Sequence, residues 1–194
     1  MFKWFFRLLF KLKGFKLVGD FPKYGKKAVI IAAPHTSNWD FVYMIAAFDI
    51  AGIPLHFTIK KEWMRWPFKG IFTRMGAIGI DRSPKQPGDD RRSMVEVMKE
   101  LFDTRDELVL TITAEGTRSR REKWKTGFYY VAKAANVPIV CSYLDYGKRE
   151  TGMDKLIWPG ENNFEEDMRE IMSFYATKTP KIAEKFSVDL RYID

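Results

Sequence analysis

Short apolar runs that alternate with helix-like segments constrain the fold of this 194-residue chain more than any other feature. Four runs have the length and composition of buried strands, at residues 28–33, 77–80, 108–113 and 138–144. Helical periodicity is found at residues 41–51, 93–102, 127–135 and 164–177. Because strands and helices alternate along the chain, we expect an α/β fold, with a mostly parallel mixed sheet flanked by helices.

The composition narrows the class of protein. Hydrophobic residues make up 46% of the chain, which is enough for a full core, and the length fits one domain. The lone Cys141 favours a reducing compartment, and two histidines, His35 and His56, are too few for a Cys/His zinc site. The formal net charge of +8 indicates an anionic partner: phosphate groups, a membrane surface or nucleic acid. Nucleic-acid binding is not expected, because the sequence has no RNA-binding aromatic signature, zinc finger or basic heptad region.

Residues 1–17 predict a short amphipathic helix. Lys3, Arg7 and Lys11 recur at helical spacing and form a narrow cationic stripe, while most other positions are aromatic or aliphatic. The apolar run of about 12 residues gives roughly 18 Å of helix, whereas the core of a bilayer is about 30 Å thick. We therefore expect residues 1–19 to lie on an anionic membrane, as a peripheral, monotopic anchor on its cytoplasmic side, and residues 20–194 to form the main domain. The alternative is a helix that packs on the domain core.

Reactive residue types follow three of the four expected strands. The segment from His35 to Asp40 follows the first strand, Asp81 and Arg82 follow the second, and residues 115–118 follow the third. In parallel sheets, ligands bind beyond the carboxyl ends of the strands. The sequence therefore predicts that these residues meet in one site.

The spacing of His35 and Asp40 fits a catalytic dyad. On one continuous helix the two side chains would point about 140° apart, but a helix that begins near Ser37 would let the carboxylate of Asp40 fold back to the imidazole. The carboxylate would then fix the tautomer, and the free ring nitrogen could take a proton from a bound hydroxyl near neutral pH. The alternative is structural, because Ser37 and Asp40 also have the spacing of a capping box.

Glycine and basic residues after the third strand are typical of an anion site. Gly116 lets backbone N–H groups approach an anion, and Arg118 offers a fork of donors that matches phosphate. Arg82 is a second candidate phosphate ligand, and its alternative role is an ion pair with Asp81. Further cations follow as far as Lys125, and a solvated basic face is the alternative for them.

Together and in this order, these segments resemble the glycerolipid (lysophospholipid) acyltransferase family, whose best-known members are 1-acylglycerol-3-phosphate acyltransferases. The segment from His35 to Asp40 matches the family's H-x-S-x-x-D block, and residues 61–82, 115–119 and 137–140 resemble the second, third and fourth blocks. Residues 124–127 resemble the aromatic-Lys-x-Gly segment that follows the third block. The chain departs from the family pattern at Pro34, Thr113-Ala114 and Cys141. These departures leave the identity of the acceptor substrate open.

The resemblance implies a fold, an activity and a set of site residues. Residues 20–194 would form an acyltransferase domain in which His35 is the general base and Asp40 orients it. The donor would be acyl-CoA or an acyl-carrier-protein thioester, used as a substrate, with no bound cofactor and no metal. The residues implied to bind the phosphate and glycerol of the acceptor are Arg82, Glu115, Gly116, Thr117, Arg118 and Lys125.

Two expectations refine these implied roles. An ionised Glu115 would repel a phosphate beside it, so we expect this side chain to orient Arg118 or the acceptor hydroxyls. Backbone N–H groups near Gly116 are candidates for stabilising the oxyanion of the thioester.

A lysophospholipid, with lysophosphatidic acid foremost, is the expected acceptor. A different acceptor such as a lyso-aminolipid is one alternative, and a non-catalytic lipid-binding protein of the same fold is another. The acyl length would depend on an apolar tunnel, for which the candidate lining residues are Phe41, Met44, Trp63, Trp66 and Phe72.

Overall fold

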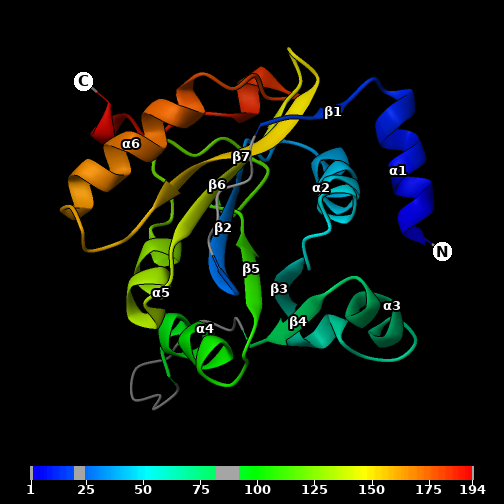
Figure 1. Ribbon diagram of the computed structural model, residues 1–194, viewed down its shortest axis with the longest axis horizontal. Coiled ribbons are helices and arrows are strands. Elements are labelled where there is room, and N and C mark those ends of the chain that lie inside the picture. The colour runs from blue at the N-terminus through cyan, green and yellow to red at the C-terminus, as the bar shows by residue number, and fades with distance from the viewer. Residues whose placement is uncertain (1, 20–24, 82–91, 194) are drawn as a thin grey trace.

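The computed structural model describes residues 2–19, 25–81 and 92–193 (Figure 1). Within these residues one sheet of seven strands has the order β1-β7-β6-β2-β5-β3-β4. The strands are β1 (Lys16–Leu17), β2 (Lys27–Ala33), β3 (His56–Lys60), β4 (Ala77–Ile80), β5 (Leu108–Ile112), β6 (Ile139–Asp145) and β7 (Glu150–Ile157). The α-helices are α1 (Phe2–Leu12), α2 (Asn38–Ala51), α3 (Lys69–Arg74), α4 (Met94–Asp103), α5 (Gly127–Ala135) and α6 (Phe164–Ala176).

Most of the sheet is parallel. Strand β2 lies between β5 and β6 and is parallel to both, and β3 is parallel to β5 and β4. Strand β7 pairs with β6 in the antiparallel direction, and β1 runs parallel to β7. The carboxyl ends of β2 to β6 therefore meet at one edge, which we call the carboxyl edge. The expected α/β fold with a mostly parallel mixed sheet is confirmed.

The four predicted strands are β2, β4, β5 and β6, each within one residue of its predicted bounds, and the predicted helices correspond to α2, α4, α5 and α6. Strands β1, β3 and β7 were not predicted. The first has only two residues, and β3 and β7 are only partly buried. Gly152 and the charged Asp154 and Lys155 interrupt the apolar pattern of β7, so its strand structure depends on pairing with β6.

Helices cover both faces of the sheet (Figure 1). Alternate residues of a strand point to opposite faces, so Ile30 and Val109 pack against Phe48 of α2. Ile31 and Leu110 belong to the larger core, which α4, α5 and α6 complete. The C-terminal residues 177–193, which include the 3₁₀ helices η2 (Ala183–Lys185) and η3 (Leu190–Tyr192), return along the α6 side.

Helix α1 packs on α2 with one side and leaves the other side exposed. Buried Phe10 contacts Tyr43 of α2. Two cations of the stripe, Lys3 and Arg7, form ion pairs with Asp49 of α2. The exposed side of α1 carries large apolar residues: Trp4, Phe5, Leu8 and Leu12. Among the described residues, no helix combines the length and the apolar character needed to cross a bilayer.

Candidate active site

The turn between β2 and α2 places His35 and Asp40 at the carboxyl edge. A cis Ala33-Pro34 bond ends the strand, and Ser37 is the N-cap of α2. The helix begins at Asn38, so Asp40 occupies its first turn and its carboxylate points back toward the turn. The capping box of Ser37 and Asp40 is present, and the same geometry brings Asp40 to His35. The capping box is therefore confirmed, and the helix start also folds the carboxylate back to the imidazole as expected; the catalytic role of the pair stays a prediction.

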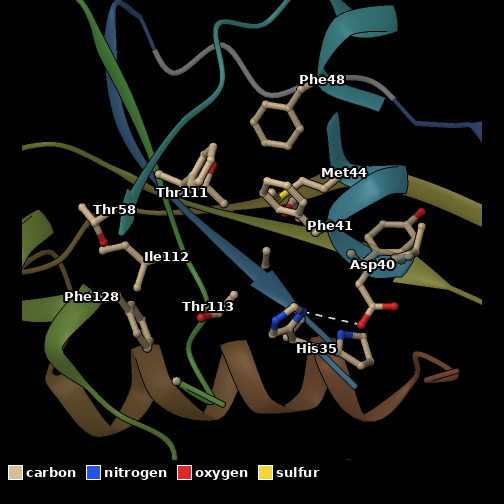
Figure 2. A pocket seen from close by; sticks show the side chains of 18 of the residues that line it. His35, Asp40, Phe41, Met44, Phe48, Thr58, Thr111, Ile112, Thr113 and Phe128 are labelled. Carbon is tan, nitrogen blue, oxygen red and sulfur yellow. Dashed lines mark ion pairs between the residues drawn. The ribbon is translucent and has the colours of Figure 1, made fainter. Parts of the chain in front are cut away.

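His35 and Asp40 form a pair at the edge of a cavity (Figure 2). Nδ1 of His35 lies 3.5 Å from Oδ2 of Asp40, and the two side chains are 19% and 6% exposed. A carboxylate on Nδ1 favours the tautomer that carries its proton there, which leaves Nε2 as the basic nitrogen. The pair has the polarity that a general base requires.

Asp40 is held as a carboxylate by three further donors. Its Oδ2 accepts hydrogen bonds from the backbone N–H groups of Thr36 and Ser37, at 2.7 and 2.8 Å. Its Oδ1 accepts a 2.6 Å hydrogen bond from the hydroxyl of Tyr146. Burial by itself would raise the pKa of Asp40, but the hydrogen bonds from His35, Tyr146 and the two amides outweigh it and lower the pKa. Asp40 therefore stays ionised and can stabilise an imidazolium.

Glu115 is buried and bonded to the turn that carries His35. Its side chain is 3% exposed, and its Oε2 accepts a 2.8 Å hydrogen bond from the backbone N–H of His35. Oε1 is buried without a hydrogen-bond partner among the described residues. Burial raises the pKa of Glu115 to about 8, an effect that the His35 amide opposes and the charge of Asp40 reinforces. Near neutral pH this carboxyl group is mainly protonated.

The loop after β5 brings Gly116 and two cations to the same edge. Gly116 has φ +68°, and a Cβ there would lie 2.8 Å from Cδ of Lys125. Its N–H donates to the carbonyl of Thr113 within the turn, and the expected oxyanion donors near Gly116 stay a prediction. Arg118 donates to Oδ1 of Asn38, at the start of α2. Glu115 and Arg118 are thus each held by the segment that carries His35.

Trp124 fixes the backbone next to Lys125. The indole is buried, its backbone N–H donates to Asp189, and its Nε1–H donates to the carbonyl of Ser187. The N–H of Lys125 itself donates to the carbonyl of Ala114. The C-terminal segment therefore secures the position from which Lys125 reaches the site.

The cavity beside His35 has a volume of about 520 Å³. Its walls are mainly apolar, as Figure 2 shows for Phe41, Met44, Phe48, Ile112 and Phe128. The predicted site residues that line it are His35, Asp40, Gly116, Arg118 and Lys125. An adjoining, more open hollow is lined by Thr117, Arg118 and Ser119, and by Trp63 and Phe72. An apolar cavity with cations at its exposed end suits an amphiphile with an anionic head group.

The structure thus brings together seven of the eight predicted site residues, and Arg82 lies outside the described residues. Of the proposed tunnel residues, Phe41 and Met44 line the cavity, Trp63 and Phe72 line the hollow, and Trp66 is 92% exposed. Cys141 is fully buried in β6, where it packs as a small core residue.

Sequence reasoning missed two residues of the site, Tyr146 and Asn38. Tyr146 directly follows β6, so the rule that drew attention to the ends of the other strands also applied to it. Asn38 lies within the predicted His35–Asp40 block, but nothing in its spacing indicated a bond to Arg118.

Comparisons with known proteins place this chain in a family. A family model described as acyltransferase matches residues 15–144, about two thirds of the chain. The matched region contains His35, Asp40 and the loop from Glu115 to Lys125. Searches of curated proteins and of solved structures gave no match. The chain belongs to the acyltransferase family that includes the glycerolipid acyltransferases.

Proposed function

We propose that this acyltransferase moves a fatty acyl group from acyl-CoA or an acyl-carrier-protein thioester to a hydroxyl of a lysophospholipid. Lysophosphatidic acid is the acceptor we favour. The observation that carries the proposal is the His35–Asp40 pair at the edge of an apolar cavity of about 520 Å³, with the cations of Arg118 and Lys125 lining the same cavity. The cavity offers space for an acyl chain, and the cations offer charge for a phosphate.

The reaction needs one base and no covalent enzyme intermediate. Nε2 of His35 takes the proton of the acceptor hydroxyl while the oxygen bonds to the carbonyl carbon of the thioester. The carbon–sulfur bond then breaks, and the leaving thiolate takes the proton from the imidazolium. The products are an ester and a free thiol, and His35 returns to its neutral form. Asp40 stabilises the imidazolium between the two proton transfers.

The phosphate of the acceptor is proposed to bind where the cations gather. Arg118 is exposed, and the hydrogen bond that it donates to Oδ1 of Asn38 fixes the direction of the guanidinium. Lys125 is exposed and its side chain lies against Gly116, and Arg82 belongs to this proposal through the family resemblance alone. Thr117 lines the adjoining hollow and offers a hydroxyl to the head group. Glu115, when protonated, adds no repulsion toward the phosphate.

We further propose that the protein works as a peripheral protein on the cytoplasmic side of a membrane. The exposed aromatic and leucine residues of α1 support insertion at the interface, as expected for residues 1–19. Ion pairs with Asp49 engage Lys3 and Arg7, so apolar contact rather than the cationic stripe carries most of this binding.

The test is release of free thiol from acyl thioesters offered with a panel of lysolipids. His35→Ala should lower the rate at least about 100-fold, the scale of a lost general base. His56→Asn is the matched control, because His56 begins β3 and lies at the strand end away from the carboxyl edge. Circular dichroism and vesicle binding should be unchanged in the His35 variant.

The outcomes separate the alternatives. Turnover with a lyso-aminolipid but with no lysophospholipid would replace the acceptor and keep the mechanism. Lipid binding without thiol release for any acceptor would identify a non-catalytic lipid-binding protein. Near-normal turnover in the His35 variant would refute the role of the imidazole.

A further inference from the structure

We propose that residues 61–75, between β3 and β4, form a second membrane contact that docks the mouth of the site on an anionic bilayer. We call this stretch the aromatic–basic segment; it includes the 3₁₀ helix η1 (Lys61–Trp63) and α3. The inference deepens the proposed function, because the bilayer would hold the acceptor. It concerns a surface separate from α1, with its own side chains.

Large apolar side chains of the aromatic–basic segment face outward. Trp66 is 92% exposed, and Trp63, Phe68 and Ile71 are 59%, 55% and 45% exposed. Isolated exposed apolar residues are common on proteins, but four within one short stretch mark an interaction surface. Tryptophan is the side chain that best suits the interface between head groups and acyl chains.

The charge of the segment selects an anionic partner. The four cations of the segment are Lys61, Arg65, Lys69 and Arg74, and its one acid is Glu62. All five of these side chains are exposed. Aromatic rings interleaved with exposed cations match a surface that is apolar below and negatively charged above, which is the chemistry of an anionic lipid leaflet.

The position of the segment relates it to catalysis. It begins directly after β3, at the carboxyl edge where His35 and Arg118 lie. Trp63 and Phe72 line the open hollow together with these two residues. Helix α1 lies on the same side of the molecule as α3 in Figure 1. A bilayer that contacts the segment would therefore adjoin the entrance through which a lipid reaches His35.

Binding to vesicles of equimolar phosphatidylcholine and phosphatidylglycerol tests the proposal, measured by co-sedimentation of the full chain. Replacing Trp66 and Phe68 together by alanine should lower the partition coefficient at least tenfold, with α1 intact. The control replaces Trp158 and Leu190 by alanine. Both are exposed. Because β7 is antiparallel to β6, Trp158 follows β7 at the end of the strands that lies opposite the carboxyl edge. The control should bind like the unmodified protein.

A second measurement reports insertion without removing several side chains. Cys141 is fully buried, so a Phe68→Cys variant can be labelled at position 68 with an environment-sensitive nitrobenzoxadiazole dye. Its emission should shift to the blue and gain intensity on the anionic vesicles. The same dye at a Trp158→Cys site should show no change.

The results show whether the aromatic–basic segment binds a membrane or a protein, and they do not depend on the outcome of the thiol-release assay. Unchanged binding of the alanine variant, or no response of the dye at position 68, would overturn the membrane contact. Dye response to a purified protein partner in place of vesicles would assign the surface to that partner and also overturn it. Loss of vesicle binding in a protein that releases no thiol would support the contact while refuting the proposed transfer.

Discussion

The burial of the Glu115 carboxyl group predicts how the free energy of unfolding depends on pH. Replacing it by glutamine keeps the shape and keeps an oxygen that can accept the hydrogen bond from the His35 N–H. The substitution removes the charge that appears on the native side chain when it ionises. Glu115→Gln therefore isolates the energetic cost of an ionised carboxylate with one amide donor in a buried position.

The sign and size follow from the shift in pKa. Burial raises the pKa of Glu115 from 4.5 to about 8, so the folded protein binds this proton more tightly than the unfolded chain. Its contribution to stability is complete below the unfolded pKa and is lost as pH rises through the folded pKa. Each pKa unit corresponds to about 1.4 kcal/mol, so the free energy of unfolding lost between the unfolded and the folded pKa is at most about 5 kcal/mol. The glutamine variant does not ionise at this position and therefore does not lose this free energy.

Urea unfolding of both proteins at several pH values measures the effect. The free energies of unfolding should be similar near about pH 5 and should diverge up to about pH 8, with the variant becoming the more stable protein. Glu122→Gln is the control, because Glu122 is exposed. Its free energy of unfolding should depend on pH in the same way as that of the unmodified protein. Parallel profiles for Glu115→Gln and the unmodified protein would refute the reasoning.

Two further predictions concern the site. Tyr146→Phe removes the hydroxyl donor to Asp40 and keeps the ring. The kcat for thiol release should therefore fall about tenfold, while the unfolding midpoint moves little. An unchanged kcat would show that Tyr146 does not position the His35–Asp40 pair. Arg118→Ala should raise KM for lysophosphatidic acid about tenfold or more and leave KM for a phosphate-free monoacylglycerol unchanged. Arg120→Ala is the control, because Arg120 is also exposed. Equal effects on both acceptors would contradict phosphate binding by Arg118.

The predictable part of the fold is the part with strong local patterns. Strands β2, β5 and β6 are continuous apolar runs because both of their faces are covered, and the structure finds them within one residue of the predicted bounds. Strand β7 carries Asp154 and Lys155 and lies at the antiparallel side of the sheet, where burial is incomplete. Its strand structure is decided by pairing with β6, which no local pattern reports.

The candidate site divides in the same way. The spacing of His35, Ser37 and Asp40 was sufficient to predict a helix start that folds the carboxylate back to the ring. The bond from Tyr146 to Asp40 and the bond from the His35 amide to Glu115 join residues far apart in the chain. Their identity depends on which strands are neighbours, and that order is a property of the whole sheet.

By itself the sequence determined the chemistry available: one imidazole and one carboxylate at a helix start, a glycine between an acid and a cation, and an amphipathic N-terminal helix. Only the tertiary structure decided how that chemistry is tuned. Burial without sufficient donors raises the pKa of Glu115, and burial with several donors lowers that of Asp40. The two carboxyl groups differ because solvation and hydrogen bonding are set by the packed surroundings, while local spacing sets only which groups can approach one another.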